Sequence, residues 1–146
     1  MDFDLTEVQR LTREMVRMFA EKEVKPRAAA YAKQRTAFGQ ALANFQAIQF
    51  MVADMSAQIE AARLLVRKAA FLKDQGRSVV REAAEAKLFA SEMAARVTTD
   101  ALQIHGAYGY SKDFAIERLY RDARVYQIWE GASQIQRSVI GRRLFR

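Results

Sequence analysis

The sequence predicts an all-α protein, an up-and-down bundle of about four helices in one domain. Glycine and proline are scarce, with six and one in 146 residues. Apolar residues recur at steps of three and four, which is the helical period. Only the segment RVYQIW, residues 124–129, has the composition of a strand. One strand without a partner does not make a sheet, so no sheet is expected.

The first helix is expected to begin at DLTE, residues 4–7, where the acid three positions after Asp4 has the spacing of a capping box. Pro26 is expected to kink or end this helix, because its ring removes a donor and crowds the preceding turn. A second helical stretch, residues 27–38, leads to Gly39, a plausible stop. The apolar positions of the first helix are Val8, Leu11, Met15 and Phe19.

Two longer segments show the clearest helical pattern, and each predicts a bundle helix with one buried seam. The first ends near Gly76 and the second near HGAYGY, residues 105–110. A short helix over 113–124 and a last helix with Ile135, Val139 and Leu144 are expected to follow. The two seams are Phe45, Ile48, Val52, Met55, Ile59, Ala62, Val66 and Ala69, then Ala83, Ala86, Ala90, Met93, Val97, Ala101 and Ile104.

Composition limits the possible functions. The chain has no cysteine and one histidine, His105, which excludes disulfides, thiolate chemistry and a histidine metal cluster within one chain. No apolar run approaches the roughly 20 residues of a membrane span, and no secretory signal follows Met1, so a cytoplasmic protein is expected. The net charge is +7, but Lys and Arg alternate with acids and lack the aromatic interleaving of RNA-binding segments.

The basic residues after Glu130 are the one uncompensated run. They have two interpretations: a solvated helix face, or contact with an anionic partner such as a phosphate or a CoA-type ligand. The run consists of Arg137, Arg142, Arg143 and Arg146.

Glu130 is the first candidate for chemistry, because it lies between Trp129 and Gly131 at the expected start of the last helix. Two interpretations stay open. An acid near a helix N-terminus is favourable through the helix dipole alone. Alternatively, Trp129 forms an apolar wall that desolvates the carboxylate and makes it a useful general base.

Two glycine-containing segments are weaker candidates. In QIHGAYGY, Gly106 and Gly109 flank Tyr108 and could leave backbone amides free for a ligand, although a helix C-cap followed by a turn explains the same pattern. In RTAFG, Arg35 next to aromatic Phe38 could bind a phosphate and stack on a ring.

Taken together, these segments closely resemble the acyl-CoA dehydrogenase family, over nearly the whole chain. The most specific set is R..FG, a glutamine eleven positions after that arginine, QIHGA.GY, YRDAR and EGASQIQR, in the family's order. The resemblance implies an FAD enzyme that oxidises acyl-CoA thioesters to 2-enoyl-CoA. Members of this family work as homodimers or larger homo-oligomers, so self-association is expected.

The resemblance also assigns roles to individual residues. Glu130 matches the base that removes the α-proton, and its backbone amide would polarise the thioester carbonyl. Gly131 would leave space for the substrate. Arg35, Phe38 and Gln46 match FAD contacts. So do two further segments: Gln103, Ile104, His105, Gly106 and Ala107, which reach the FAD of a neighbouring subunit, and Ala132, Ser133 and Gln134.

The chain departs from the family pattern in one large respect. FAEKEVKPRAAA passes directly into YAKQRTAFG, so residues 1–30 match the family's N-terminal helix, residues 31–146 match part of its C-terminal bundle, and the middle β-domain that holds the flavin is missing between them. Ala107 and Ala132 replace a usual glycine and threonine. Two functions therefore remain open: an impaired acyl-CoA dehydrogenase, or a non-catalytic helical bundle, natural or engineered, that self-associates.

Overall fold

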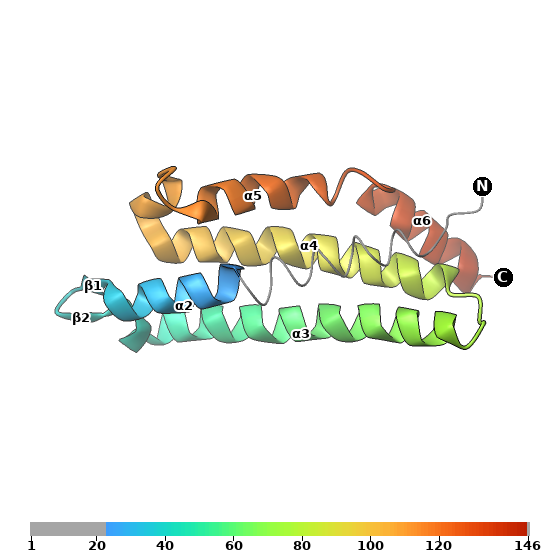
Figure 1. Cartoon of the computed structure of the whole chain (residues 1–146), viewed down its shortest axis with the longest axis horizontal. Coiled ribbons are helices and arrows are strands. Elements are labelled where there is room, and N and C mark those ends of the chain that lie inside the picture. Colours follow the sequence, from blue (N-terminus) through green and yellow to red (C-terminus); the bar gives the residue numbers. More distant parts are fainter. Residues whose placement is uncertain (1–22, 146) are drawn as a thin grey trace.

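The computed structural model describes residues 23–145. Five α-helices make up most of this part; α2 to α5 run alternately up and down, and α6 continues in the general direction of α5 (Figure 1). The first three are α2 (Lys25–Gln34), α3 (Gln46–Asp74) and α4 (Val80–His105). The last two are α5 (Ala115–Val125) and α6 (Ser133–Leu144). The predicted all-α fold is confirmed, while the expected first helix over residues 4–19 lies outside the described residues.

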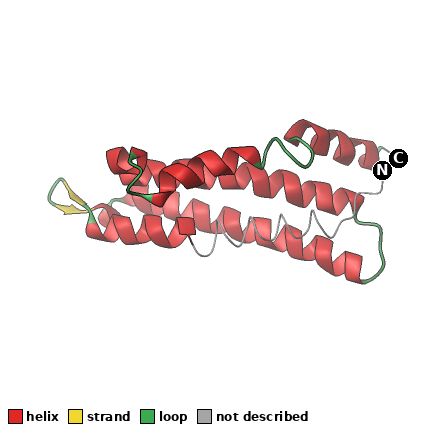
Figure 2. Cartoon of the chain, turned by 45° about the horizontal axis from the view of Figure 1, so that its top comes forward, coloured by secondary structure: helices red, strands yellow, loops and turns green. Residues whose placement is uncertain are grey.

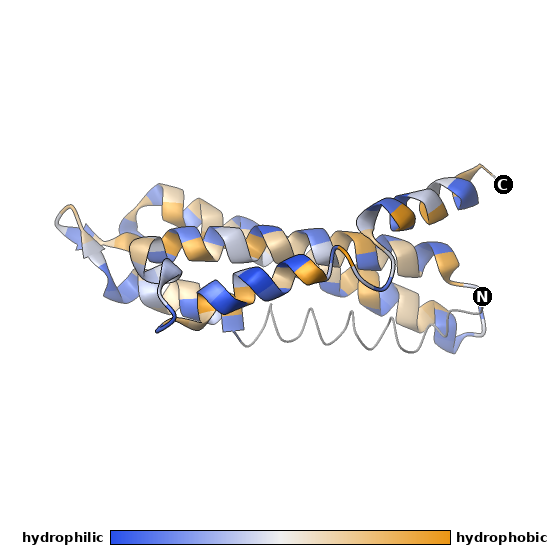
Figure 3. Cartoon of the chain, turned by 90° about the horizontal axis from the view of Figure 1, so that it is seen from above, coloured by the Kyte–Doolittle hydropathy of each residue, from blue (hydrophilic) through white to orange (hydrophobic). Residues whose placement is uncertain are grey.

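Helix α4 is the centre of the molecule, because it contacts α2, α3, α5 and α6. Its two buried faces are rich in alanine, which lets the neighbouring helices approach closely. Helix α5 turns a mainly hydrophilic face outward (Figure 3). All seven residues of the predicted α4 seam are buried: Ala83, Ala86, Ala90, Met93, Val97, Ala101 and Ile104.

Helix α3 packs antiparallel to α4 along its length (Figure 1). Its predicted seam is buried from Met55 to Ala69, and Met55 is only 1% exposed. At the start of the helix, Phe45, Ile48 and Val52 are half-buried. The seam was therefore placed correctly, and its burial is greatest away from the end of the bundle.

The segment after Gln34 differs from the prediction. The helix expected over residues 27–38 ends at Gln34, and a hairpin follows in which β1 (Thr36–Ala37) pairs antiparallel with β2 (Gln40–Ala41). Phe38 and Gly39 both have positive φ, 51° and 81°, as a two-residue type I′ turn requires. The expectation of no sheet was wrong at this point, where the hairpin projects from one end of the bundle (Figure 2).

Pro26 lies in the first turn of α2, with Val24 as the N-cap residue. Proline is well tolerated there, because the first-turn amides of a helix have no acceptor within that helix. Residues 23 and 24 already have helical backbone, and the helix that Pro26 is expected to kink or end lies outside the described residues. After α3, the chain turns at Gly76, which has a φ of 72°.

Candidate functional site

The predicted site residues form two groups at different places along α4. Lys87 of α4 contacts the loop that contains Glu130 and Gly131, between α5 and α6. His105 ends α4 next to the hairpin and the 3₁₀ segment η3 (Gly106–Tyr110). Eighteen residues of helix separate Lys87 from His105, or about 27 Å at 1.5 Å per residue. One chain does not bring the two groups together.

The Glu130 loop has an unusual backbone. Glu130 and Gly131 have φ values of 53° and 90°, and a non-glycine residue at positive φ is uncommon. A Cβ at Gly131 would lie 2.5 Å from Nε2 of Gln136, which itself donates to the carbonyl oxygens of Glu130 and Gly131. The loop therefore needs glycine at position 131, and its shape turns Glu130 into solvent.

Glu130 is exposed, and Trp129 is half exposed and packs edge-on against Tyr126 at 6.0 Å between ring centroids. The desolvating wall expected from Trp129 is therefore not formed around Glu130 within the described chain. The other expectation, proximity to a helix N-terminus, is confirmed: Ala132 is the N-cap residue and α6 begins at Ser133. The helix dipole favours a negative charge at that end.

Lys87 of α4 binds the backbone of the Glu130 loop and keeps the loop in place. Its side chain comes from the buried face of α4 and is only 5% exposed, and its Nζ donates a 2.6 Å hydrogen bond to the carbonyl oxygen of Gly131. Burial lowers the pKa of Lys87, and the nearby charge of Glu130 opposes that effect. An ammonium group thus lies behind the loop that presents the candidate base.

Helix α6 places the remaining residues of this group. The Ser133 hydroxyl is buried and has no hydrogen-bond partner among the described residues, while the Ser133 amide donates to the carbonyl of Gln127 at 3.1 Å. Gln134 is exposed and Ala132 is half-buried.

Arg137, from the basic run, pairs with Glu92 of α4 at 2.5 Å. This ion pair joins α6 to α4 next to the Glu130 loop.

The second group is built on a cluster of aromatic rings. His105 is buried, stacks on Tyr31 at 4.3 Å between centroids, and meets the carbonyl of Ala101 through Nδ1 at 2.7 Å. Phe114 meets Tyr31, His105 and Tyr108 edge-on or tilted, at 5.8–5.9 Å. This cluster fixes the end of α4, where Gly106 at φ 57° is the C-cap residue.

Around the cluster, several predicted residues face outward. The Arg35 guanidinium carbon lies 5.3 Å from the centroid of the Tyr108 ring, in the arrangement of a cation–π contact. Phe38 at the hairpin turn is 96% exposed, and Gln46, Gln103, Gly106 and Ala107 are also exposed. Ile104 and His105 are buried within the described chain, where their side chains position the segment.

The sequence analysis missed Lys87, Tyr31 and Phe114. A signal for Lys87 was present, because it falls on a second line of small α4 residues at steps of three and four. That line is buried throughout: Ala84, Lys87, Ser91, Ala94 and Thr98. Nothing in the local pattern indicated that Tyr31 and Phe114, which lie in different segments, would meet at His105.

A family model for the acyl-CoA dehydrogenase C-terminal domain matches residues 5–145. The chain therefore belongs to the acyl-CoA dehydrogenase family. It is 56% identical to "Probable acyl-CoA dehydrogenase YngJ" of Bacillus subtilis over 117 residues, which are 80% of this chain and 31% of the relative. It is 52% identical to the caffeyl-CoA reductase-Etf complex subunit CarC of Acetobacterium woodii over 75% of this chain and 29% of that protein.

Solved structures agree with this assignment. Butyryl-CoA dehydrogenase from Megasphaera elsdenii superposes with a TM-score of 0.87 and 43% identity, covering 97% of this chain and 36% of that one. The chain thus spans about a third of the length of the relatives it matches. No helix in the described part is long and apolar enough to cross a membrane, and the same residues contain no group of three potential metal ligands among His, Cys, Asp and Glu.

Proposed function

We propose that this chain supplies the catalytic base and two cofactor-contacting surfaces of an acyl-CoA dehydrogenase, and that each complete site takes these surfaces from two copies. The observation behind this proposal is the separation along α4. The Glu130 loop and the Arg35–Gln103 surface lie about 27 Å apart by helix rise, too far for one compact reaction centre. Both surfaces nevertheless have the residues that the family resemblance assigns to the site.

In the proposed reaction, the Glu130 carboxylate accepts the α-proton of an acyl-CoA thioester. Its own backbone amide would donate to the thioester carbonyl and so acidify that proton. Lys87 and Gln136 fix the loop from behind through the Gly131 carbonyl, which keeps the carboxylate pointing outward. FAD, when bound, supplies the acceptor for the hydride that leaves the β-carbon.

The described residues fit an extended, phosphate-containing cofactor that lies across the ends of two copies. Arg35 offers a cation held over an aromatic ring, and Phe38 offers an exposed ring on a projecting hairpin. At the other surface, the unpartnered Ser133 hydroxyl lies at the N-terminus of α6, where the helix dipole favours an anion. These two surfaces would contact the edges of the cofactor. The contacts to its flavin ring would come from a domain outside this chain.

The relatives include acyl-CoA dehydrogenases as well as a caffeyl-CoA reductase subunit and a 3-(aryl)acrylate reductase. The proposal is therefore limited to α,β-oxidation or reduction of an acyl-CoA-type substrate. A second candidate function, a non-catalytic bundle, is favoured by the exposure of Glu130 in the single chain. Under that function, the isolated chain with added FAD shows no acyl-CoA-dependent reduction of an electron acceptor.

The two functions are separated by a chimera in which residues 35–146 of this chain replace the matching segment of Megasphaera elsdenii butyryl-CoA dehydrogenase. We expect the chimera to bind FAD and to oxidise butyryl-CoA. Glu130→Gln should then lower kcat by about 10²–10⁴-fold, since an amide cannot accept the proton. Melting temperature should be almost unchanged, because Glu130 is exposed.

Glu117→Gln is the matched control, because Glu117 lies on α5 and pairs with Arg121 at 3.0 Å away from the Glu130 loop. We expect this control to retain full activity. A chimera that binds FAD but does not oxidise butyryl-CoA would favour the non-catalytic bundle. Full activity in Glu130→Gln would remove Glu130 from the mechanism.

A further inference from the structure

We propose that the ion pair between Arg137 of α6 and Glu92 of α4 positions the Glu130 loop, and that Arg137 is thereby a positioning residue for the candidate base. The pair joins Nη2 of Arg137 to Oε1 of Glu92 at 2.5 Å. Arg137 thus has a partner within its own chain, although it belongs to the basic run whose sequence also suited an anionic ligand. The catalytic part of this assignment rests on the proposed function.

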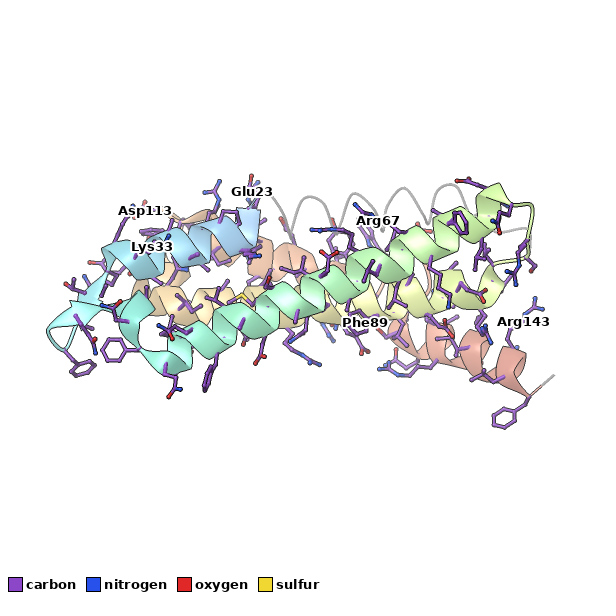
Figure 4. All side chains as sticks on the ribbon, turned by 90° about the horizontal axis from the view of Figure 1, so that it is seen from below. Glu23, Lys33, Arg67, Phe89, Asp113 and Arg143 are labelled. Atoms are coloured by element: carbon purple, nitrogen blue, oxygen red, sulfur yellow. The ribbon has the colours of Figure 1, made fainter. Side chains whose placement is uncertain are left out.

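Helix α6 has few contacts that could fix its position. Among the described elements, α4 is the one with which α6 has extensive contacts, and Figure 3 shows α6 apart from α5 at one end of the bundle. Ser133 is the single buried residue of this helix, and Arg143 lies near its free end (Figure 4). A helix with so little buried side-chain surface has little packing to fix its rotation, so a specific polar contact can determine it.

Two hydrogen bonds that shape the Glu130 loop begin on α6. The Gln136 side-chain amide donates to the carbonyl oxygens of Glu130 and Gly131, at 3.3 and 3.2 Å. The Ser133 backbone amide donates to the carbonyl oxygen of Gln127 at 3.1 Å. Both donors lie within the same rigid helix as Arg137. Rotation or sliding of α6 therefore moves both donors, and the loop with them.

Helix α4 holds this segment at both ends. Lys87 donates to the Gly131 carbonyl, and Glu92 pairs with Arg137 six residues later in the chain. Lys87 and Glu92 are five residues apart, or about 7.5 Å along α4. Lys87 alone fixes one point of the segment and leaves α6 free to pivot about it. The second contact, at Arg137, removes that freedom.

The exposure of the pair separates its effect on position from its effect on folding. The side chains of Arg137 and Glu92 are 53% and 34% exposed. An ion pair as exposed as this contributes little to global stability, because water and salt screen it. Catalysis is more sensitive, since a small displacement of a reacting group slows the chemical step strongly. Loss of the pair should therefore change the loop while the melting temperature stays almost the same.

Hydrogen exchange on the whole chain tests the positioning without any catalysis. We expect Arg137→Gln to accelerate exchange of the Ser133 amide by about two- to fivefold, the range of an exposed ion pair. Glu92→Gln should have the same effect, and the double variant should add nothing, because all three lose one contact. Arg143→Gln is the control, since it removes a charge from α6 that has no ion pair in the described chain. Unchanged exchange in Arg137→Gln, or additive effects in the double variant, would overturn the proposal.

Kinetics in the butyryl-CoA dehydrogenase chimera test the consequence for the base. Arg137→Gln should lower kcat by about three- to tenfold and change KM by less than about twofold, because a displaced base slows chemistry more than binding. Arg137→Lys keeps a cation for Glu92 and should recover most of the activity. Arg121→Gln, which breaks an exposed ion pair on α5, should be fully active.

Two other kinetic results have a definite meaning. A raised KM with unchanged kcat in Arg137→Gln would assign Arg137 to an anionic group of the substrate and would overturn the positioning role. An inactive wild-type chimera would count against the proposed function, whereas the exchange of the Ser133 amide would still decide whether the ion pair positions the loop.

Discussion

Lys87 is a buried cation whose ammonium ends on one backbone carbonyl, that of Gly131. A hydrogen bond from a charged group contributes about 1.5–3 kcal/mol, and burial of the charge offsets part of it. Removing the side-chain charge should therefore change global stability little but loosen the loop. The bond acts locally because its acceptor lies in a loop rather than in a helix.

For Lys87→Met, we expect amide hydrogen exchange at Trp129 and Ser133, whose amides donate to the carbonyls of Val125 and Gln127, to accelerate by at least about tenfold, the factor that corresponds to 1.4 kcal/mol. The global free energy of unfolding should change by less than about 1 kcal/mol, because the lost bond and the relieved burial oppose each other. Lys87→Arg, which keeps a donor, is the comparison. Exchange as slow as in the wild type would show that Gln136 alone holds the loop.

A substitution at Gly131 tests the backbone conformation of the same loop. Gly131→Ala should destabilise the protein by about 1–2 kcal/mol, since a Cβ residue at φ 90° is strained. The nearby Gln136 amide is the end of a flexible side chain and can move. Gly141→Ala is the control, because Gly141 lies inside α6 with open space around it, and should stabilise by about 0.5–1 kcal/mol. Chemical denaturation measures both, and equal effects would contradict the strain argument.

Between elements, α3 and α4 bring two acids together. Burial raises the pKa of Asp100, Arg96 opposes this effect, and Asp54 adds to it. The folded protein thus binds this proton more tightly than the unfolded chain does. Stability is therefore lost as pH rises from the ordinary value of 3.8 through the raised pKa, and at pH 7 the cost is fully present.

Asp100→Asn should consequently stabilise the protein at pH 7 by on the order of 0.5 kcal/mol, the size of a surface charge interaction. The gain should disappear at pH 3, where both forms are neutral at this position. Urea unfolding at the two pH values measures the difference. Asp122→Asn, on the exposed side of α5, is the control and should not stabilise the protein at pH 7. A gain of the same size at pH 3 would assign the effect to packing.

The helices could be predicted from sequence because a seven-residue seam is a local pattern, as the burial of Met55 and Val97 shows. The hairpin could not. Phe38 is a poor residue for positive φ, so the pattern lacked the Asn-Gly or Gly-Gly signal that marks a type I′ turn. The helical alanines before Arg35 extended the predicted helix into a segment whose backbone turns back.

Over the whole molecule, the candidate residues could be named from sequence but their separation could not. Glu130 and Gln103 are close in the chain, yet α5 carries the chain back along α4 between them. Proximity in sequence therefore gave no measure of distance in space. The Lys87 contact, which joins residues 44 positions apart, was hidden for the same reason.

This separation leads to a complementation test in the butyryl-CoA dehydrogenase chimera. If each site takes Glu130 from one copy and Arg35 from another, Glu130→Gln and Arg35→Met should each be inactive as homo-oligomers. After subunit exchange, a mixed dimer contains one site with both residues intact and one with neither. Random exchange should then restore about one quarter of wild-type activity, since half of the dimers are mixed and half of their sites are intact.

Exchange is verified by differently tagged chains, and the control is a mixture of two Glu130→Gln preparations, which should stay inactive. Restoration cannot arise from a site within one chain, because every chain in the mixture has a defect. Confirmed exchange without recovered activity would mean that Arg35 and Glu130 serve the same copy. In that case the 27 Å that separates the two groups along α4 would have to be spanned by one cofactor on one chain.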